Sequence, residues 1–525
     1  MRIRGLSCAI AALTGITLAT GAAAQDNLVT LKSFDGFTQL RGELVDFDGQ
    51  RYTIQTRLGV LQIDVFLVSC EGEACPTSTL FGAEFGIHGS STVGAALMPS
   101  LIEGYAESME ASVEGELTGD DNQRVFRIIH SSGEEMANID FQTRGSSSAF
   151  RSLTDGSASI GMASRSIKEE EVASLGAAGL RDPRETELEL AIAKDGILVI
   201  VHPDNPVRSI SLNELASIYS GQITNWADLG GSDREITVYA HDDASGTRDT
   251  FDNLVLAPIS EELTPNAVVL SEAAELSDRV AGDISGIGYG GLAFERTARA
   301  LPLRQECGLL SYPTSFAIKS DEYPLARRLF LYGSDEQESI HAQNLMNFAA
   351  SDDAAPFIED AGYISLLPEA QTLREQGQRI THAIIAEDEF SLDLMREMLT
   401  EFRDAERLSL TFRFTPGSSQ LTAQSQADAE RFARDIVAGR YEGKEILLVG
   451  FTDSIGQFAL NRALATRRAQ GVLFTMNEAV ASVAGASGFA GANISVQGYG
   501  ELTPVGCNTT FAGRVANRRV EVWVR

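Results

Sequence analysis

The stretch HDDASGTRDTF, residues 241–251, places small hydroxyl residues at the start of a predicted helix. Ser245, Gly246 and Thr247 would present hydroxyl and backbone N–H groups at the positive end of that helix. Hydroxyl and N–H groups are donors that can surround an oxyanion without a neutralising cation. The stretch therefore predicts part of an anion-binding site.

Three other stretches place hydroxyl residues before a predicted helix. They are GSSTVGAALMPSLIEGYAES (89–108) with Ser91 and Thr92, RGSSSAFRSL (144–153) with Ser146 and Ser147, and ASIGMASRSIKEEEVASL (158–175) with Ser164. Taken singly, each has an ordinary explanation, because Ser and Thr are preferred helix N-caps. Four such starts, two of them beside an arginine (Arg165 and Arg248), favour one convergent oxyanion site over four unrelated caps.

A different pair of charged residues stands near the C-terminus. Asp453 lies in GFTDSIG (450–456), after the apolar strand EILLVGF, and Arg468 lies in NRALATRRA (461–469), expected one to two turns into the next helix. An aspartate and an arginine presented together can hold the ammonium and carboxylate groups of an amino-acid zwitterion. The alternative is a structural salt bridge between them.

The charge balance excludes one class of partner. The chain has 73 Asp and Glu against 42 Lys and Arg, a formal net charge of −31, which argues against a nucleic-acid partner. From Leu408 onward, however, 12 basic residues face 9 acidic ones. This asymmetry indicates at least two parts with different partners.

The N-terminus predicts export. Residues 1–25 combine Arg2 and Arg4, an apolar run, and small residues ending in Ala22–Ala24, the pattern of a cleaved secretory signal. No later apolar run approaches the length of a membrane-spanning helix. In an oxidising compartment, Cys70 and Cys75 could close a small disulfide loop; metal binding by this pair is the minor alternative. Cys307 and Cys507 are left either paired or free.

The apolar pattern divides the exported chain into four segments. Residues 26–80 alternate apolar and polar side chains around turn signals and predict a small antiparallel β domain that packs or docks a partner. Residues 81–370 alternate short strands with amphipathic helices and predict an α/β domain with a largely parallel sheet. Residues 371–407 predict a linker with one helix, and residues 408–525 a second α/β domain.

Residues 83–370 resemble the periplasmic phosphate-binding proteins of ABC transporters. The resemblance is carried, in order, by GSSTV, GSSS, IGMASRSI, DGILVIVHPDNPV, LASIYSGQITNWADLGG, ASGTRDTF and GDISGIGYGGLAF. It implies a two-lobed clamshell that holds inorganic phosphate, or a related oxyanion, in the cleft between its lobes. The ligand shell it implies is Ser91, Thr92, Ser146 or Ser147, Ser164, Ser245, Gly246 and Thr247.

Two positions depart from this family. Ser164 stands where some members have an Asp that accepts a proton from phosphate, although Arg165 beside it matches a common variant. His241 stands where many members have the arginine that pairs with phosphate. With a usual pKa of about 6.5, His241 could make binding pH-sensitive, or Arg248 could supply the missing charge. The alternative is that His241 is a hydrogen-bonded strand residue.

Residues 408–525 resemble the OmpA-like peptidoglycan-binding domain, through GFTDSIG, NRALATRRA, QGYGE and GRVANRRVEV. The resemblance implies that Asp453 and Arg468 clasp the diaminopimelate of a peptidoglycan stem peptide, while Thr452 and Asn461 shape the site. Arg518 and Arg519 match the terminal motif and are expected to be partly structural.

Together these features predict a non-enzymatic, cofactor-free α/β protein with a small N-terminal β domain, a clamshell and an OmpA-like domain. It would bind phosphate in the periplasm while attached to peptidoglycan near the outer membrane, as a receptor, sensor or reservoir, with an ABC permease or a sensor as a further partner. The alternative is a wall-associated structural or interaction protein whose clamshell no longer binds phosphate. An enzyme acting on phosphate esters would need a metal cluster that no residue spacing indicates.

Overall fold

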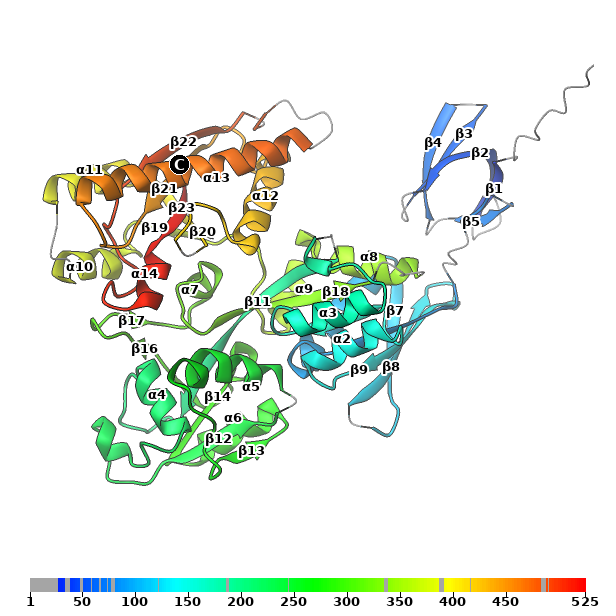
Figure 1. The fold of residues 1–525 in the computed structure, drawn as a ribbon. Coiled ribbons are helices and arrows are strands. Elements are labelled where there is room, and N and C mark those ends of the chain that lie inside the picture. The colour runs from blue at the N-terminus through cyan, green and yellow to red at the C-terminus, as the bar shows by residue number, and fades with distance from the viewer. Residues whose placement is uncertain are drawn as a thin grey trace, which may run out of the picture. The chain divides into compact units, whose positions relative to one another are not determined.

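The computed structural model describes residues 27–33, 38–47, 51–57, 59–65, 68–72, 74–76, 81–120, 122–185, 188–243, 245–334, 339–386, 391–415, 417–482, 488–489 and 491–525. The predicted signal segment, residues 1–25, therefore lies outside the described residues. The chain separates into two compact units, Met1–Leu80 and Phe81–Arg525 (Figure 1). None of the described helices is both long enough and apolar enough to span a membrane.

The N-terminal unit is an antiparallel sheet of five strands in the order β4-β3-β2-β1-β5. Its strands are β1 (Leu28–Ser33), β2 (Gln39–Phe47), β3 (Arg51–Thr56), β4 (Gly59–Asp64) and β5 (Val68–Glu71). Val29, Leu31, Tyr52 and Ile54 are buried at alternate positions. A disulfide joins Cys70 to Cys75.

The second unit contains an 11-stranded sheet that runs through two lobes, in the order β13-β12-β14-β11-β18-β10-β6-β9-β8-β7, with β15 paired to β11. The prediction of a largely parallel sheet is wrong. Only β6 with β9 and β10, and β12 with β13 and β14, pair in parallel. The hairpins β7–β8 and β8–β9 and the long strand β11 introduce antiparallel neighbours.

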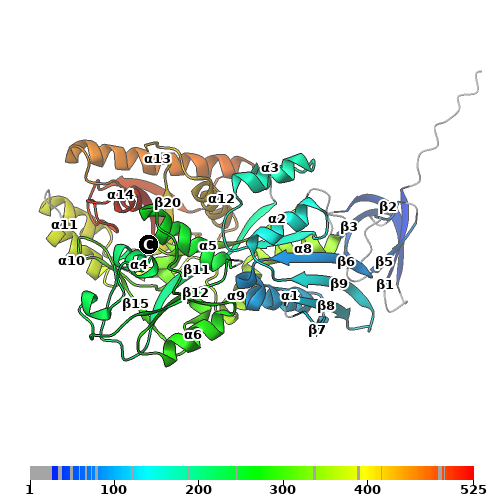
Figure 2. The same cartoon turned by 60° about the horizontal axis from the view of Figure 1, so that its bottom comes forward.

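Lobe 1 carries helices on both faces of its part of the sheet, with α2 and α3 on one face and α1 on the other (Figure 2). Its elements are β6 (Ala83–Gly89), α1 (Met98–Glu107), β7 (Ala111–Leu117), β8 (Gln123–His130), β9 (Glu135–Gln142), α2 (Ser146–Thr154), β10 (Ile160–Ala163), α3 (Glu169–Ala177), α8 (Ile340–Ala349) and α9 (Ala355–Asp360).

Lobe 2 is built around a core of aromatic and aliphatic side chains that includes Tyr219, Trp226, Phe251 and Tyr289. Its elements are α4 (Leu212–Tyr219), β12 (Thr237–His241), α5 (Gly246–Phe251), β13 (Val268–Leu270), α6 (Ala273–Gly282), β14 (Gly286–Gly291), β15 (Arg299–Leu301), β16 (Leu303–Arg304), β17 (Leu310–Ser311) and α7 (Ser315–Lys319). The glycine-rich GIGYGG is strand β14, fully buried.

Two antiparallel strands, β11 (Glu189–Val201) and β18 (Ala326–Gly333), connect the lobes. The first half of β11 pairs with β18, and its second half pairs with β14 and β15 of lobe 2. Asp195 lies opposite Arg327, and Lys194 lies opposite Arg328. Because successive side chains of a strand point to opposite faces, these two charged pairs lie on opposite faces of the connecting strands.

The C-terminal domain is a five-stranded sheet, ordered β19-β20-β23-β21-β22, with helices on both faces. Its elements are β19 (Ala370–Thr372), α10 (Gly377–Ala386), α11 (Leu392–Glu401), β20 (Glu406–Arg413), α12 (Ala423–Val437), β21 (Glu445–Phe451), α13 (Phe458–Ser482), β22 (Asn493–Gly498), α14 (Phe511–Asn517) and β23 (Arg519–Val524). Ile446 and Leu448 of β21 pack towards α12 and α13, whereas Leu447 and Val449 pack towards α10 and α11.

This arrangement explains why residues 371–407 do not form the expected linker. A strand buried on both faces reads as a continuous apolar run, as EILLVGF does, and needs a layer on each side. Ala383, Leu394 and Met398 supply the second layer, against Leu447 and Trp523. The segment is therefore part of the C-terminal domain.

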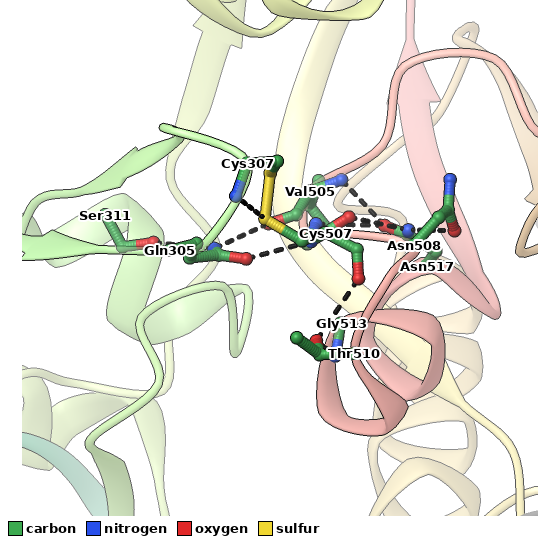
Figure 3. The surroundings of a disulfide bond; sticks show 10 residues. Gln305, Cys307, Ser311, Val505, Cys507, Asn508, Thr510, Gly513 and Asn517 are labelled. Carbon is green, nitrogen blue, oxygen red and sulfur yellow. Dashed lines mark hydrogen bonds between the residues drawn. A yellow bond between two sulfur atoms is a disulfide. The ribbon is translucent and has the colours of Figure 1, made fainter. Parts of the chain in front are cut away.

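A second disulfide joins lobe 2 to the C-terminal domain, between Cys307 and Cys507 (Figure 3). Gln305 supports it from lobe 2: its side-chain Oε1 accepts from the Cys507 backbone N–H at 2.9 Å, and its Nε2 donates to the Val505 carbonyl at 3.4 Å. Cys307 and Cys507, left open by the sequence, are therefore paired across 200 residues of chain.

Candidate functional site

The predicted anion-binding residues converge where the two lobes meet. Thr92, Ser146 and Ser164 come from lobe 1, and Gly246 and Thr247 come from α5 of lobe 2; we call these five residues the cradle. Thr92 Oγ1 lies 3.0 Å from Thr247 Oγ1, and Ser146 Oγ lies 3.3 Å from Ser164 Oγ. All four hydroxyl residues are buried.

Gly246 brings the lobes into close approach. A Cβ added at this position would lie 2.0 Å from Ser164 Oγ and 2.7 Å from Ser146 Oγ, closer than any real contact. Only glycine therefore fits here without moving the serine side chains away.

A cavity of about 570 Å³ opens beside the cradle, between the lobes. Residues of both lobes line it, among them Ser91, Thr92, Arg124, Arg144, His241, Ser245 and Thr247. Ser164 and Arg165 instead line a separate cavity of about 310 Å³, together with Arg327 and Arg328. Of the predicted residues, five line the first cavity, Ser164 and Arg165 line the second, and Ser146, Ser147, Gly246 and Arg248 line neither.

Ser245 and Ser164 were both expected to point a hydroxyl group at an anion from the start of a helix, but their hydroxyl and backbone groups make other contacts. Ser245 is the N-cap of α5: its Oγ accepts from the backbone N–H groups of Thr247 and Arg248 at 3.2 and 3.4 Å. Ser164 does not start a helix, because α3 begins only at Glu169. Its backbone N–H donates to Ser146 Oγ at 3.1 Å.

The two predicted arginines are paired with carboxylates. Arg165 lies 2.7 Å from Glu171 and 2.8 Å from Asp249, and it donates to the exposed Ser147 Oγ at 3.0 Å. Asp249 belongs to lobe 2, so this pair also links the lobes. Ser147 lines neither cavity.

Arg248 donates to Asp252 at 2.6 Å and to the His241 carbonyl at 3.1 Å. The Arg248 side chain lines neither of the two cavities. Its guanidinium contacts the carboxylate of Asp252 and not the cradle.

His241 is a neutral strand residue. It ends β12, is 2% exposed, and its Nε2 has no hydrogen-bond partner among the described residues. Burial and the nearby Arg327 guanidinium lower the pKa of His241 to about 4. In the protein without a ligand, desolvation disfavours the imidazolium, which favours the alternative that His241 is a neutral strand residue.

Arg327, which no sequence motif marks, donates a hydrogen bond to a cradle hydroxyl. Its Nη2 donates to Thr247 Oγ1 at 2.9 Å, and its Nε and Nη2 donate to Asp195 Oδ2 at 3.0 and 2.7 Å. Both side chains are buried, and Arg327 Nη1 has no partner among the described residues. The other Asp195 oxygen accepts from the Leu292 backbone N–H at 3.0 Å.

The C-terminal domain forms a second candidate site, which we call the clasp: Thr452, Asp453, Asn461, Arg468 and Arg518. Thr452 and Asp453 directly follow β21, and Arg468 lies about three turns into α13, deeper than expected. Asn461 donates to the Asp453 carbonyl at 3.3 Å. All but Arg518 are classed as buried.

Asp453 and Arg468 do not form a salt bridge with each other, which was the structural alternative for this pair. Asp453 Oδ2 instead accepts from Arg518 Nη1 at 2.7 Å. Arg468 lies over the Phe414 ring, at 5.2 Å, and its Nε and Nη1 are buried without a partner among the described residues. Burial and the Arg518 charge lower the pKa of Arg468. The clasp therefore offers unpaired guanidinium donors next to a carboxylate.

Comparisons with known proteins match two parts of the chain to two families. Residues 128–353 match the PBP superfamily domain, and residues 413–518 match the OmpA family. The chain thus carries one region similar to the PBP superfamily domain, called here the PBP domain, and one similar to the OmpA family, called here the OmpA domain.

Individual relatives cover the PBP part. The phosphate-binding protein PstS of Staphylococcus saprophyticus is 27% identical over 297 residues, which is 53% of this chain and 89% of that protein. The Staphylococcus aureus PstS is 26% identical over 293 residues, 53% of this chain and 86% of that protein. A phosphate ABC transporter substrate-binding protein from Clostridium perfringens, solved with bound phosphate, is 27% identical with a TM-score of 0.41, covering 54% of this chain and all of that one.

The lowered pKa of His241 predicts a loss of stability in acid. An unfolded chain, with a histidine pKa near 6.5, binds more protons than the folded one between about pH 6.5 and 4, so the folded state is destabilised as the pH falls through this range. His241→Gln should remove a contribution of about 3 kcal/mol to this pH dependence.

Chemical unfolding of both proteins between pH 4 and 7 measures this difference, with His202→Gln as the control. Parallel pH profiles for His241→Gln and the unaltered protein would show that His241 does not titrate as described.

Proposed function

We propose that the PBP domain binds inorganic phosphate, or a closely related tetrahedral oxyanion, between its two lobes. The observation that carries the proposal is the convergence of hydroxyl groups from both lobes around Gly246, next to an unpaired buried Arg327 nitrogen. The names of the PstS relatives support the same ligand. A site of fixed donors needs no net positive charge, because local dipoles act within a few ångströms.

The OmpA domain is the second part of the proposal. Its clasp presents unpaired Arg468 donors beside the Asp453 carboxylate, a combination suited to the carboxylate and ammonium of diaminopimelate in a peptidoglycan stem peptide. The protein would then be attached to peptidoglycan in the periplasm. Attachment to the wall favours a sensor or a local phosphate reservoir over a freely diffusing receptor for an ABC permease.

A second candidate function is a wall-associated structural protein with no anion ligand. The observation that favours it is the neutral His241 at a position where the resemblance implies a cation. The two functions differ in whether the folded protein binds phosphate.

Calorimetric titration with phosphate and then sulfate, at two pH values either side of neutrality, should show phosphate binding that is tighter than sulfate binding. Gly246→Ala should abolish it, because the added methyl group occupies the cradle. Gly282→Ala, where the methyl group would meet nothing within 4 Å, is the matched control. If the folded protein gives no heat with either anion, the structural alternative holds instead.

Peptidoglycan attachment should depend on the clasp. We expect Asp453→Ala and Arg468→Ala each to weaken co-sedimentation with purified peptidoglycan by about 10- to 100-fold, since each removes a charged hydrogen-bonding group. Arg467→Ala, at the exposed neighbouring position of α13, should sediment normally. Phosphate binding should be unchanged in all three proteins, and normal sedimentation of both clasp variants would refute the attachment.

A further inference from the structure

We infer that Arg327 is the cation that contacts the bound oxyanion, in place of the arginine that the family resemblance implies at position 241. This inference rests on the proposed oxyanion binding. It assigns the counter-charge to a residue of the strand that connects the lobes, about 80 residues further along the chain from Thr247.

Arg124 and Arg144 also line the cavity, and Arg144 pairs with Asp120. Three further arginines, Arg165, Arg248 and Arg327, lie beside the cradle and differ in their partners. Arg165 faces Glu171 and Asp249, and Arg248 faces Asp252. Only Arg327, among these three, donates directly to a cradle hydroxyl.

The hydrogen bonds of Arg327 also orient the donors of the cradle. Thr247 Oγ1 accepts from Arg327 Nη2, so its own O–H remains free to donate to Thr92 or to an anion. Arg327 Nη1 has no partner among the described residues and is buried, a costly state for a charged group unless a ligand satisfies it. An oxyanion oxygen beside Thr247 would supply that partner.

Asp195 holds the guanidinium in this orientation. Two Arg327 nitrogens donate to one Asp195 oxygen, and the other oxygen is fixed by the Leu292 backbone N–H. The pair is neutral as a whole, with its positive end towards Thr247. An Arg327 contact should therefore favour a doubly charged oxyanion over a singly charged one, without giving the site a net charge.

The test is phosphate titration of the neutral pair Asp195→Asn/Arg327→Met, which leaves no buried charge unpaired. Phosphate affinity should fall about 10- to 100-fold, the effect of losing one charged hydrogen bond. Its rise across the second ionisation of phosphate should flatten, which a purely structural role would not cause. Arg327→Lys, which keeps the charge, should retain part of the affinity and the pH profile.

The control is Arg304→Met/Glu214→Gln. This ion pair of lobe 2 lines neither cavity and, among the described residues, makes no contact with the cradle or the C-terminal domain, so phosphate binding should be unchanged. Equal phosphate affinity of the unaltered protein and a folded Asp195→Asn/Arg327→Met protein would overturn the inference. If that protein does not fold, a phosphate affinity of Arg327→Lys equal to that of the unaltered protein would overturn it. Absence of phosphate binding by the unaltered protein would overturn the proposed function itself.

A second inference comes from the contacts of the C-terminal domain. A disulfide, Cys307–Cys507, joins this domain covalently to lobe 2. An ion pair between Arg440 and Asp352 links it non-covalently to lobe 1. It also pairs with the connecting strand β18, through Arg328 and Asp428. Lobes that separate by rotation about connecting strands would have to break or strain these links.

We propose that the Cys307–Cys507 disulfide restrains the opening of the lobes and so slows the release of the bound anion. This proposal also rests on oxyanion binding. The disulfide is the covalent link among these contacts, and Gln305 reinforces it with two hydrogen bonds. Reduction would leave lobe 2 held to the C-terminal domain by non-covalent contacts alone.

Stopped-flow displacement of phosphate measures the effect on release. Cys307→Ser/Cys507→Ser should raise the dissociation rate constant at least about fivefold, since changes in affinity between related proteins arise mostly in this rate. Cys70→Ser/Cys75→Ser, which removes the disulfide of the N-terminal unit, is the matched control and should release phosphate at the unaltered rate.

A reductant added to the Cys70→Ser/Cys75→Ser protein gives a second measurement that does not require the Cys307 variant to fold. An unchanged dissociation rate in either measurement, with phosphate still bound, would overturn the restraint. Failure of the unaltered protein to bind phosphate would instead overturn the proposed function.

Discussion

The pairing of β11 with β18 is the constraint on which the two lobes and the C-terminal domain depend. In this register Asp195–Arg327 and Lys194–Arg328 are neighbouring cross-strand pairs. Strand alternation directs the first pair to the cradle and the second to the C-terminal domain. Lys194 and Arg328 carry like charges and are neutralised on their face by Asp321 and Asp428. A slip by one residue would exchange the two faces and separate these cations from their carboxylates, and Arg327 from Asp195. The cost of burying unpaired charges therefore fixes the register, and with it the position of the cradle relative to the OmpA domain.

Charges that cancel locally also explain how so acidic a protein could bind an anion. Carboxylates on the surface act through a field that salt screens over roughly 8 Å, whereas the cradle donors would act at hydrogen-bond distance. The buried groups around the cradle add little net charge: His241 is neutral, and Asp195 neutralises Arg327. Selection between anions would then depend on the direction of donors and on the orientation of one ion pair. A net charge of −31 would slow the arrival of an anion without preventing its binding.

The sequence predicted the parts of each site that are local in the chain. Hydroxyl residues at strand ends and helix starts mark the cradle, because capping and anion binding use the same exposed backbone groups. The Arg327–Asp195 pair has no such signal, since it joins residues 132 positions apart through sheet register. The pairing of Asp453 with Arg518, and of Cys307 with Cys507, could not be predicted either, because each joins residues far apart in the chain. The sequence pattern of residues 371–407 predicts a linker with one helix, and α11 corresponds to that helix. Its apolar face is explained only by a sheet that needs a second layer, which the sequence alone does not show.

The clasp shows how charge pairing in the free protein shapes recognition of a zwitterion. Asp453 already accepts from Arg518, whereas two Arg468 nitrogens have no partner among the described residues. A ligand carboxylate would satisfy Arg468 without displacing any described group, but a ligand ammonium would have to share Asp453 with Arg518, a like charge. Binding through this geometry would gain most from the carboxylate end of the ligand. It would gain less from the ammonium end, so a wall attachment made here would be reversible unless many such domains, or contacts outside the clasp, contribute.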